Sequence, residues 1–162
     1  MAPPRAVSRS GSGYVLHLSR DERTVVASLL EELRQMLLSP TTPDALARLF
    51  PVVHPDEPAR EAEYQRLMRE ELVTSRLAGI DTVTAVLERP GRKVQLGADE
   101  LLAFVQAVNS IRLVLGTVLD VTEDDELDPP DELAESAEYQ LYGYLSWVLD
   151  SSVRAMSGDL PD

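Results

Sequence analysis

The sequence predicts a mainly α-helical protein: a single-domain helical bundle around a buried central helix, with a small two-stranded β element. Three observations predict this fold. Apolar residues recur at helical spacing over several long stretches. Only two short segments alternate between apolar and polar residues as strands do. With 162 residues, 44% hydrophobic and 27% charged, the chain has the size and balance of one globular domain.

The first elements follow from local signals. Residues 1–13 are rich in Pro, Ser and Gly, which predicts a flexible tail. Residues 14–18 alternate and predict a short strand. Ser19 and Glu22 have the spacing of a capping box, so a helix is expected from there to about Leu38.

The middle of the chain is expected to be helical with one further strand. Asp44 can cap a short helix that runs through Phe50. Residues 59–88 carry an apolar stripe, and the sequence leaves open whether they form one helix or two that meet near Ala78–Gly79. Residues 93–96 alternate, and this second strand is expected to pair with the first.

The two last helices complete the bundle. Residues 97–119 have the widest apolar face, which predicts a central and heavily buried helix. A last helix is expected over about 131–156. The domain therefore spans 14–158, and 159–162 form a frayed tail.

Residue counts exclude several chemistries. The chain has no cysteine, which excludes disulfides, thiolate catalysis and thiol redox switches. It has two histidines, His17 and His54, and neither lies in a metal-ligand pattern. Phosphate-binding and nucleophile-elbow motifs are missing as well. We therefore expect a protein that is not an enzyme and needs no cofactor.

The charge is strongly acidic and unevenly distributed. The net charge is −13, and residues 120–138 contain ten acids and no Lys or Arg. This stretch, with Asp124, Asp125 and Glu126 near its middle, predicts a solvated loop and helix start, and it is compatible with a basic protein partner. The alternative is a calcium-binding loop, which is disfavoured because the alternating acids and the glycine of such loops are missing. An acidic body repels the phosphate backbone and argues against tight autonomous DNA binding.

Two patterns mark candidate binding residues. Asn109, Arg112 and Gly116 lie on one face of the central helix. They either serve packing, with Gly116 admitting a neighbour, or let Arg112 hold an anionic ligand with help from Asn109. On the last helix, Tyr142 and Trp147 belong to an aromatic group that either fills the core or anchors an interface.

The segment LLAFVQAVNSIRLVLGTVLDV, at 101–121, resembles the signature of an actinobacterial family of unknown function. The similarity extends to residues 138–158 and covers most of the chain. Some members are labelled oxidative-stress transcriptional regulators, so the resemblance implies a regulatory or accessory protein and no catalytic residues. Without cysteine, thiol-based oxidant sensing cannot operate in this chain.

Three functional hypotheses remain. The first is a non-catalytic regulator that binds a protein partner, such as transcription machinery, through the acidic stretch and the Tyr/Trp helix. The second is DNA binding through the arginines of the N-terminal arm, in which case removal of residues 1–13 abolishes it. The third is an enzyme or small-anion binder centred on Arg112. A homodimer is compatible with each hypothesis.

The chain has no run of about 18 apolar residues and no apolar signal-peptide core, which predicts a cytoplasmic protein outside membranes.

Overall fold

The computed structural model describes residues 4–39, 44–121 and 129–158. In chain order the elements are β1 (Val7–Ser10), β2 (Gly13–Leu16), α1 (Arg20–Leu38), the 3-10 helix η1 (Asp44–Leu49), α2 (Pro58–Leu87), β3 (Val94–Leu96), α3 (Ala98–Val118), α5 (Asp131–Ala134) and α6 (Ala137–Met156). The prediction of a mainly helical fold with a small β element is confirmed.

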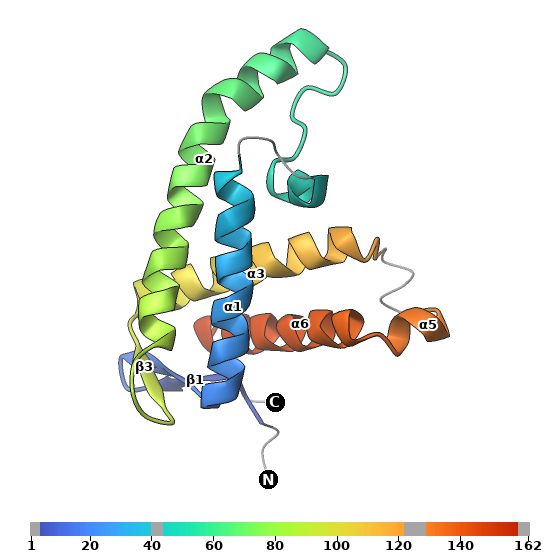
Figure 1. Cartoon of the computed structure of the whole chain (residues 1–162). Coiled ribbons are helices and arrows are strands. Elements are labelled where there is room, and N and C mark those ends of the chain that lie inside the picture. Colours follow the sequence, from blue (N-terminus) through green and yellow to red (C-terminus); the bar gives the residue numbers. More distant parts are fainter. Residues whose placement is uncertain (1–3, 40–43, 122–128, 159–162) are drawn as a thin grey trace.

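Two pairs of helices cross to form the body (Figure 1). α1 and α2 lie side by side, α3 and α6 form the second pair, and the sheet lies at one end. α3 contacts η1, α1, α2 and α6, and its Leu101, Phe104 and Val108 are almost completely buried. The predicted central helix is therefore the one around which the core is built.

The prediction of a flexible tail over 1–13 is wrong for Val7–Ser10, which form β1. The sheet has three antiparallel strands in the order β1-β2-β3, so the expected pairing of the two later strands is present and β1 is added at the edge. Gly11, at φ 61°, allows the tight turn between β1 and β2. The glycine and serine residues that suggested a tail build a hairpin instead.

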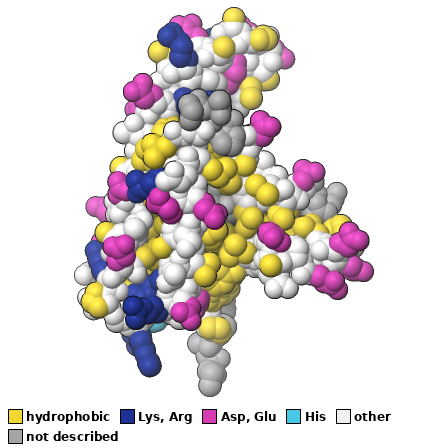
Figure 2. All heavy atoms as spheres, in the orientation of Figure 1, with side chains coloured by type: hydrophobic (Ala, Val, Ile, Leu, Met, Phe, Trp, Pro, Cys, Tyr) yellow, Lys and Arg dark blue, Asp and Glu magenta, His cyan; other side chains and the backbone are white. Residues whose placement is uncertain are grey.

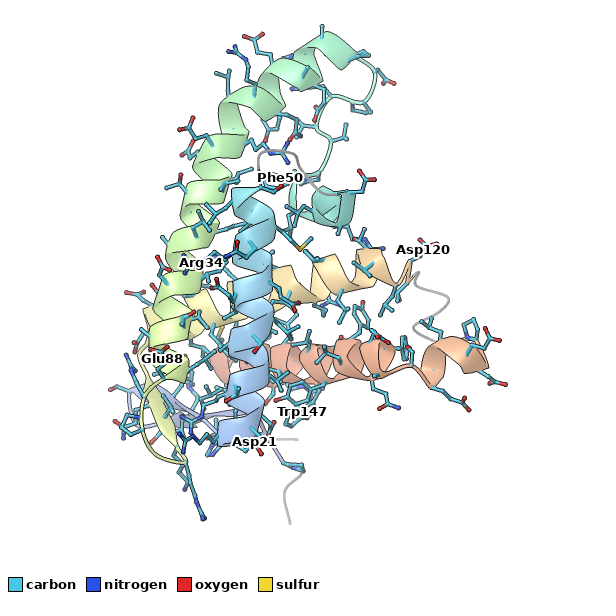
Figure 3. The ribbon with its side chains drawn as sticks, viewed as in Figure 1. Asp21, Arg34, Phe50, Glu88, Asp120 and Trp147 are labelled. Atoms are coloured by element: carbon cyan, nitrogen blue, oxygen red, sulfur yellow. The ribbon has the colours of Figure 1, made fainter. Side chains whose placement is uncertain are left out.

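The helix boundaries follow from local chemistry in most places. The capping box at Ser19 and Glu22 is formed, and it begins α1 as predicted. α2 runs through Gly79 without interruption, which answers the open question of one helix or two. Across the α1–α2 contact, Arg34 forms an ion pair with Asp81 (Figure 3).

The expected last helix over 131–156 is instead two helices, α5 and α6. The break lies at Ser136, whose hydroxyl accepts a hydrogen bond from the amide of Tyr139 and donates one to the carbonyl of Leu133. This side chain ends one helix and begins the next, because it satisfies backbone groups that a continuous helix would pair internally.

Among the described helices, α3 has the length and apolar composition of a membrane span, with a mean hydropathy of 1.6. Within the domain it packs against α1, α2, α6 and η1. Eight of its 21 residues are buried while Leu102 and Val118 are exposed, so the helix is central to the core but less heavily buried than the sequence predicts.

Candidate functional site

The signature residues of α3 meet side chains from two other elements. Asn109, Arg112 and Gly116 are spaced by three and four residues, so helical geometry places them along one face. That face lies against Tyr142 of α6 and Arg48 of η1. The five residues form a cluster that joins α3, η1 and α6, which we call the signature cluster.

Arg112 is engaged inside the signature cluster. Its Nη1 donates to the Tyr142 hydroxyl at 3.1 Å, and its Nη2 donates to Asn109 Oδ1 at 3.4 Å. The guanidinium carbon lies 5.7 Å from the centroid of the Tyr142 ring, within range of a cation–π interaction. Both Nη atoms are thus used within the protein, and this geometry supports the packing interpretation over a ligand site centred on Arg112.

Gly116 permits a close approach of neighbouring side chains. A Cβ atom at this position would lie 2.8 Å from Arg48 Nη1 and 3.2 Å from Tyr142 Cε2. Arg48 in turn donates from Nη2 to the carbonyl of Val121 at 3.0 Å. The glycine therefore lets η1 reach across α3 and hold the backbone at its C-terminal end.

The aromatic residues of α6 divide between core and surface. Tyr142 is buried, Tyr144 is partly buried, and Trp147 is 39% exposed. The Tyr144 and Trp147 rings are in contact, with centroids 5.8 Å apart and planes tilted by 40°. Trp147 lies beside the beginning of α1, near Asp21 (Figure 3). Val25 of α1 is 46% exposed and lies three residues after Glu22, which contacts Tyr144, so helical spacing places Val25 on the same side of α1 as this contact. We call Val25, Tyr144 and Trp147 the Trp147 face.

A hydrogen bond fixes this face to α1. The Tyr144 hydroxyl donates to Glu22 Oε2 at 2.5 Å. Burial raises the pKa of Glu22, but the hydrogen bonds from Tyr144 and Ser19 outweigh it, so the pKa of Glu22 lies below its ordinary value. Burial, and then the contact with Glu22, raises the pKa of the Tyr144 hydroxyl well above its usual range. Tyr144 therefore stays protonated and keeps donating at physiological pH.

The acidic stretch is only partly described. Asp124, Asp125 and Glu126 lie outside the described residues. The acids of the stretch that the structure describes, Asp131 and Glu132 on α5 among them, are exposed. Acidic side chains gather over the α5 end of the molecule (Figure 2). This end therefore presents negative charge to solvent.

A second group of polar residues, not predicted from the sequence, lines a cavity. A cavity of about 290 Å³ lies between α1, α2 and α3, and Arg76 and Ser110 are among its lining residues. Arg76 is four residues from both Leu72 and Ile80, so it interrupts the apolar stripe of α2. A charge within an apolar stripe was the signal that could have revealed this site.

Within the part of the chain that the structure describes, no group of three or more histidine and carboxylate side chains has a metal-binding arrangement. The candidate sites are therefore the signature cluster, the Trp147 face and the polar cavity. The signature cluster joins elements of the fold. The Trp147 face has exposed surface for a protein partner, and the polar cavity has room for a small ligand.

The fold is a mainly helical domain in which two helix pairs cross and a three-stranded sheet lies at one end. Its candidate sites include an exposed aromatic face and a polar cavity. Residues 4–156 match the model of a family described as a domain of unknown function, DUF2017, and the chain belongs to that family. Neither a curated protein nor a solved structure matches the chain.

Proposed function

We propose that this protein is a non-catalytic, cytoplasmic regulatory protein that acts by binding a protein partner through the Trp147 face. The exposure of Trp147 carries the proposal, since tryptophan is on average highly buried and is enriched among the residues that dominate binding interfaces. The hydrogen bond between Tyr144 and Glu22 holds the neighbouring ring in place, so little order has to be gained on binding.

The charge distribution supports a basic partner. The chain carries a net charge of −13, and the α5 end is acidic. Complementary charge speeds association and favours the correct partner. Proteins of the transcription machinery carry basic surfaces that contact nucleic acid. Together with the resemblance to regulator-labelled proteins, this makes transcription machinery the proposed partner class, in a stress response.

A site-specific crosslinking experiment tests the proposal. A photo-reactive amino acid is placed at Val25, which leaves Trp147 intact, and the matched control carries it at Leu67 of α2, which is 61% exposed. We expect a discrete adduct from Val25 and none of the same mass from Leu67. In the protein without the photo-reactive residue, Trp147→Ala should weaken binding of the crosslinked partner by about thirtyfold, because an interface tryptophan contributes about 2 kcal/mol or more to the binding free energy.

Two results would contradict this proposal. One is equal crosslinking from Val25 and Leu67, which indicates nonspecific encounters. The other is an unchanged affinity of the Trp147→Ala variant, provided that its circular dichroism matches that of the wild type. Because Trp147 is exposed, we expect the substitution to leave the fold intact.

The proposed role of the acidic stretch in partner binding has a separate test. Neutralising Asp124, Asp125 and Glu126 together, as Asn, Asn and Gln, should slow association with the crosslinked partner and reduce its dependence on salt. Affinity and salt dependence identical to those of the wild type would show that the acidic stretch does not take part.

DNA binding is the second candidate, favoured by one observation. Lys and Arg side chains gather at the end of the molecule that holds the sheet (Figure 2). Because β1 belongs to the sheet, removing residues 1–13 would damage the fold as well as the charge. The suitable variant is Arg5→Gln with Arg9→Gln. Fluorescence anisotropy with double-stranded DNA should show tight binding at about 150 mM salt, lost in this variant, if this candidate is correct.

A further inference from the structure

We propose that the cavity between α1, α2 and α3 binds a small organic anion, with Arg76 as its anchor. The polar part of the wall consists of Ser75, Arg76, Gln106, Asn109 and Ser110. The cavity volume of about 290 Å³ suits a small ligand. This proposal goes beyond partner binding, and it rests on residues that are separate from the Trp147 face.

Arg76 is half-buried, and no described carboxylate forms an ion pair with it. Its Nη1 donates to Ser110 Oγ at 2.6 Å, and that hydroxyl donates onward to the carbonyl of Gln106 at 2.9 Å. Its Nε is buried and has no hydrogen-bond partner among the described residues. No ion pair joins Arg76 to a carboxylate in the described chain, and burial lowers the pKa of its guanidinium.

Comparison with two other arginines sets Arg76 apart. Arg23, Arg76 and Arg112 each have a buried Nε without a partner in the described part of the chain. Arg23 uses both Nη atoms to hold the carbonyls of Arg89 and Gly91. Arg112 likewise uses both in the signature cluster. Arg76 makes one hydrogen bond, and of the three it alone lines the cavity.

An anion in the cavity would supply what Arg76 lacks. Removing a charge from water is costly unless a partner of opposite charge or several hydrogen bonds compensate. A carboxylate or phosphate group offers both, and the planar guanidinium matches the geometry of either. Because Arg76 is half-buried, such a group would take the place of water at the guanidinium, which gives a role to a charged side chain within an apolar stripe.

Asn109 connects this cavity to the signature cluster. Its side-chain oxygen accepts a hydrogen bond from Arg112, which leaves the amide nitrogen available as a donor at the cavity wall. Arg112 is then a positioning residue for Asn109. The rest of the wall is apolar, with Leu33, Leu72, Ile80, Ala103 and Ala107. The expected ligand thus combines one anionic group with a short aliphatic part.

Calorimetric titration of the full chain tests the proposal with three probes. Isovalerate carries a carboxylate and isobutyl phosphate carries a phosphate. Isovaleramide has the same carbon skeleton as isovalerate, with an uncharged amide in place of the carboxylate. We expect saturable binding of one or both anions and at least about tenfold weaker binding of the amide. The ranking of the two anions identifies the head group.

Two substitutions on α2 locate the binding. Arg76→Gln should lower the affinity by about tenfold to a hundredfold, the range for a hydrogen bond to a charged group. Arg66→Gln is the matched control, since Arg66 is exposed on the same helix and paired with Glu63. Equal affinities of the two variants would overturn the proposal, as would the lack of saturable binding by either anion.

Further variants separate binding from folding. Gly79 lines the cavity, and a Cβ there would meet nothing within 4 Å. Gly79→Leu should therefore fill the cavity and abolish binding while Arg76 remains. Arg76→Met should leave the ligand-free melting temperature unchanged or higher, because it removes an uncompensated charge. If Gly79→Leu binds as the wild type does, or if Arg76→Met melts well below it, Arg76 is structural and the proposal is wrong.

Discussion

At the scale of single residues, the contact between Tyr144 and Glu22 couples the aromatic face to the first turn of α1. Glu22 has two tasks there. It closes the capping box with Ser19, and it accepts the Tyr144 hydroxyl. Glu22 accepts both hydrogen bonds more strongly when it is ionised, since protonation removes the charge and part of the acceptor capacity. The exposed aromatic face is thus sensitive to pH through one side chain.

Replacement of Tyr144 by Phe tests this coupling. The pKa of Glu22 is lowered in the folded state, so its contribution to stability is present above the unfolded value of about 4.5 and is lost as the pH falls through the lower folded value. We expect Tyr144→Phe to reduce the free energy of unfolding by about 1 kcal/mol at neutral pH, a modest value because Glu22 is partly solvated.

Urea denaturation between about pH 3 and pH 7 measures this effect. The difference between the wild type and Tyr144→Phe should shrink as Glu22 becomes protonated. The exposed neighbour Trp147→Phe is a control that keeps the hydrogen bond. A difference that stays constant over the whole pH range would show that the loss comes from packing and not from the ionised carboxylate.

At the scale of elements, Ser151 of α6 holds β1 in place. Its Oγ accepts hydrogen bonds from the amides of Ala6, at 2.9 Å, and Val7, at 3.2 Å. All three residues are buried, so no water replaces the hydroxyl when it is removed. This side chain is the polar link between the edge of the sheet and the C-terminal helix.

Ser151→Ala should therefore destabilise the domain by about 2 kcal/mol, because it leaves buried amides without an acceptor. Ser152→Ala is the matched control. That hydroxyl is equally buried but donates to Val148 within its own helix, so we expect a loss of about 0.5 kcal/mol or less. Chemical denaturation measures both, and amide exchange at Ala6 and Val7 should rise only in Ser151→Ala. Equal losses would refute the assignment.

The same elements show what the sequence could predict. The start of α1 was predictable because Ser19 and Glu22 are three residues apart and act locally. The central position of α3 followed from its wide apolar face. β1 was not predictable, since what orders it includes Ser151, 144 residues further along the chain. The order of β1 comes from its local pairing with β2 and from the distant hydroxyl of Ser151, and only the second is beyond the reach of the local sequence.

The candidate sites were predictable to a smaller extent. The spacing of Asn109, Arg112 and Gly116 predicts that they share one helix face. It does not predict the hydrogen bonds that both Nη atoms of Arg112 form within the protein. The crowding of aromatics on the last helix indicated that some must be exposed, and the structure shows that Trp147 is. Arg76 was missed because periodicity identifies a stripe by its apolar members and passes over the one exception.

At the scale of the whole molecule, charge repulsion is weakly compensated. The net charge is −13. Among the described residues, the ion pairs that join different elements are Arg34–Asp81 and Arg89–Glu100, and the others lie within one helix or one turn of it. Exposed pairs of this kind contribute little. Long-range repulsion is then the larger electrostatic effect on stability.

Added salt should therefore stabilise the protein. Raising NaCl from about 10 mM to about 150 mM shortens the screening length from about 30 Å to about 8 Å. We expect the melting temperature to rise by about 3 °C, which corresponds to about 1 kcal/mol for a chain of this size. The rise should be smaller at about pH 5, closer to the isoelectric point of 4.5. A fall in melting temperature would mean that attractive pairs dominate.

The hydrogen bonds between Ser151 of α6 and the beginning of β1 also affect how the chain folds during its synthesis. A ribosome makes the chain from the N-terminal side, and domains generally fold as units. The amides of Ala6 and Val7 are made before their acceptor on Ser151, which is added 144 residues or more later. Until then the edge of the sheet lacks this anchor. β1 can therefore pair with the adjacent β2 before it is secured to α6, and its two amides lack the Ser151 acceptor until α6 has been made.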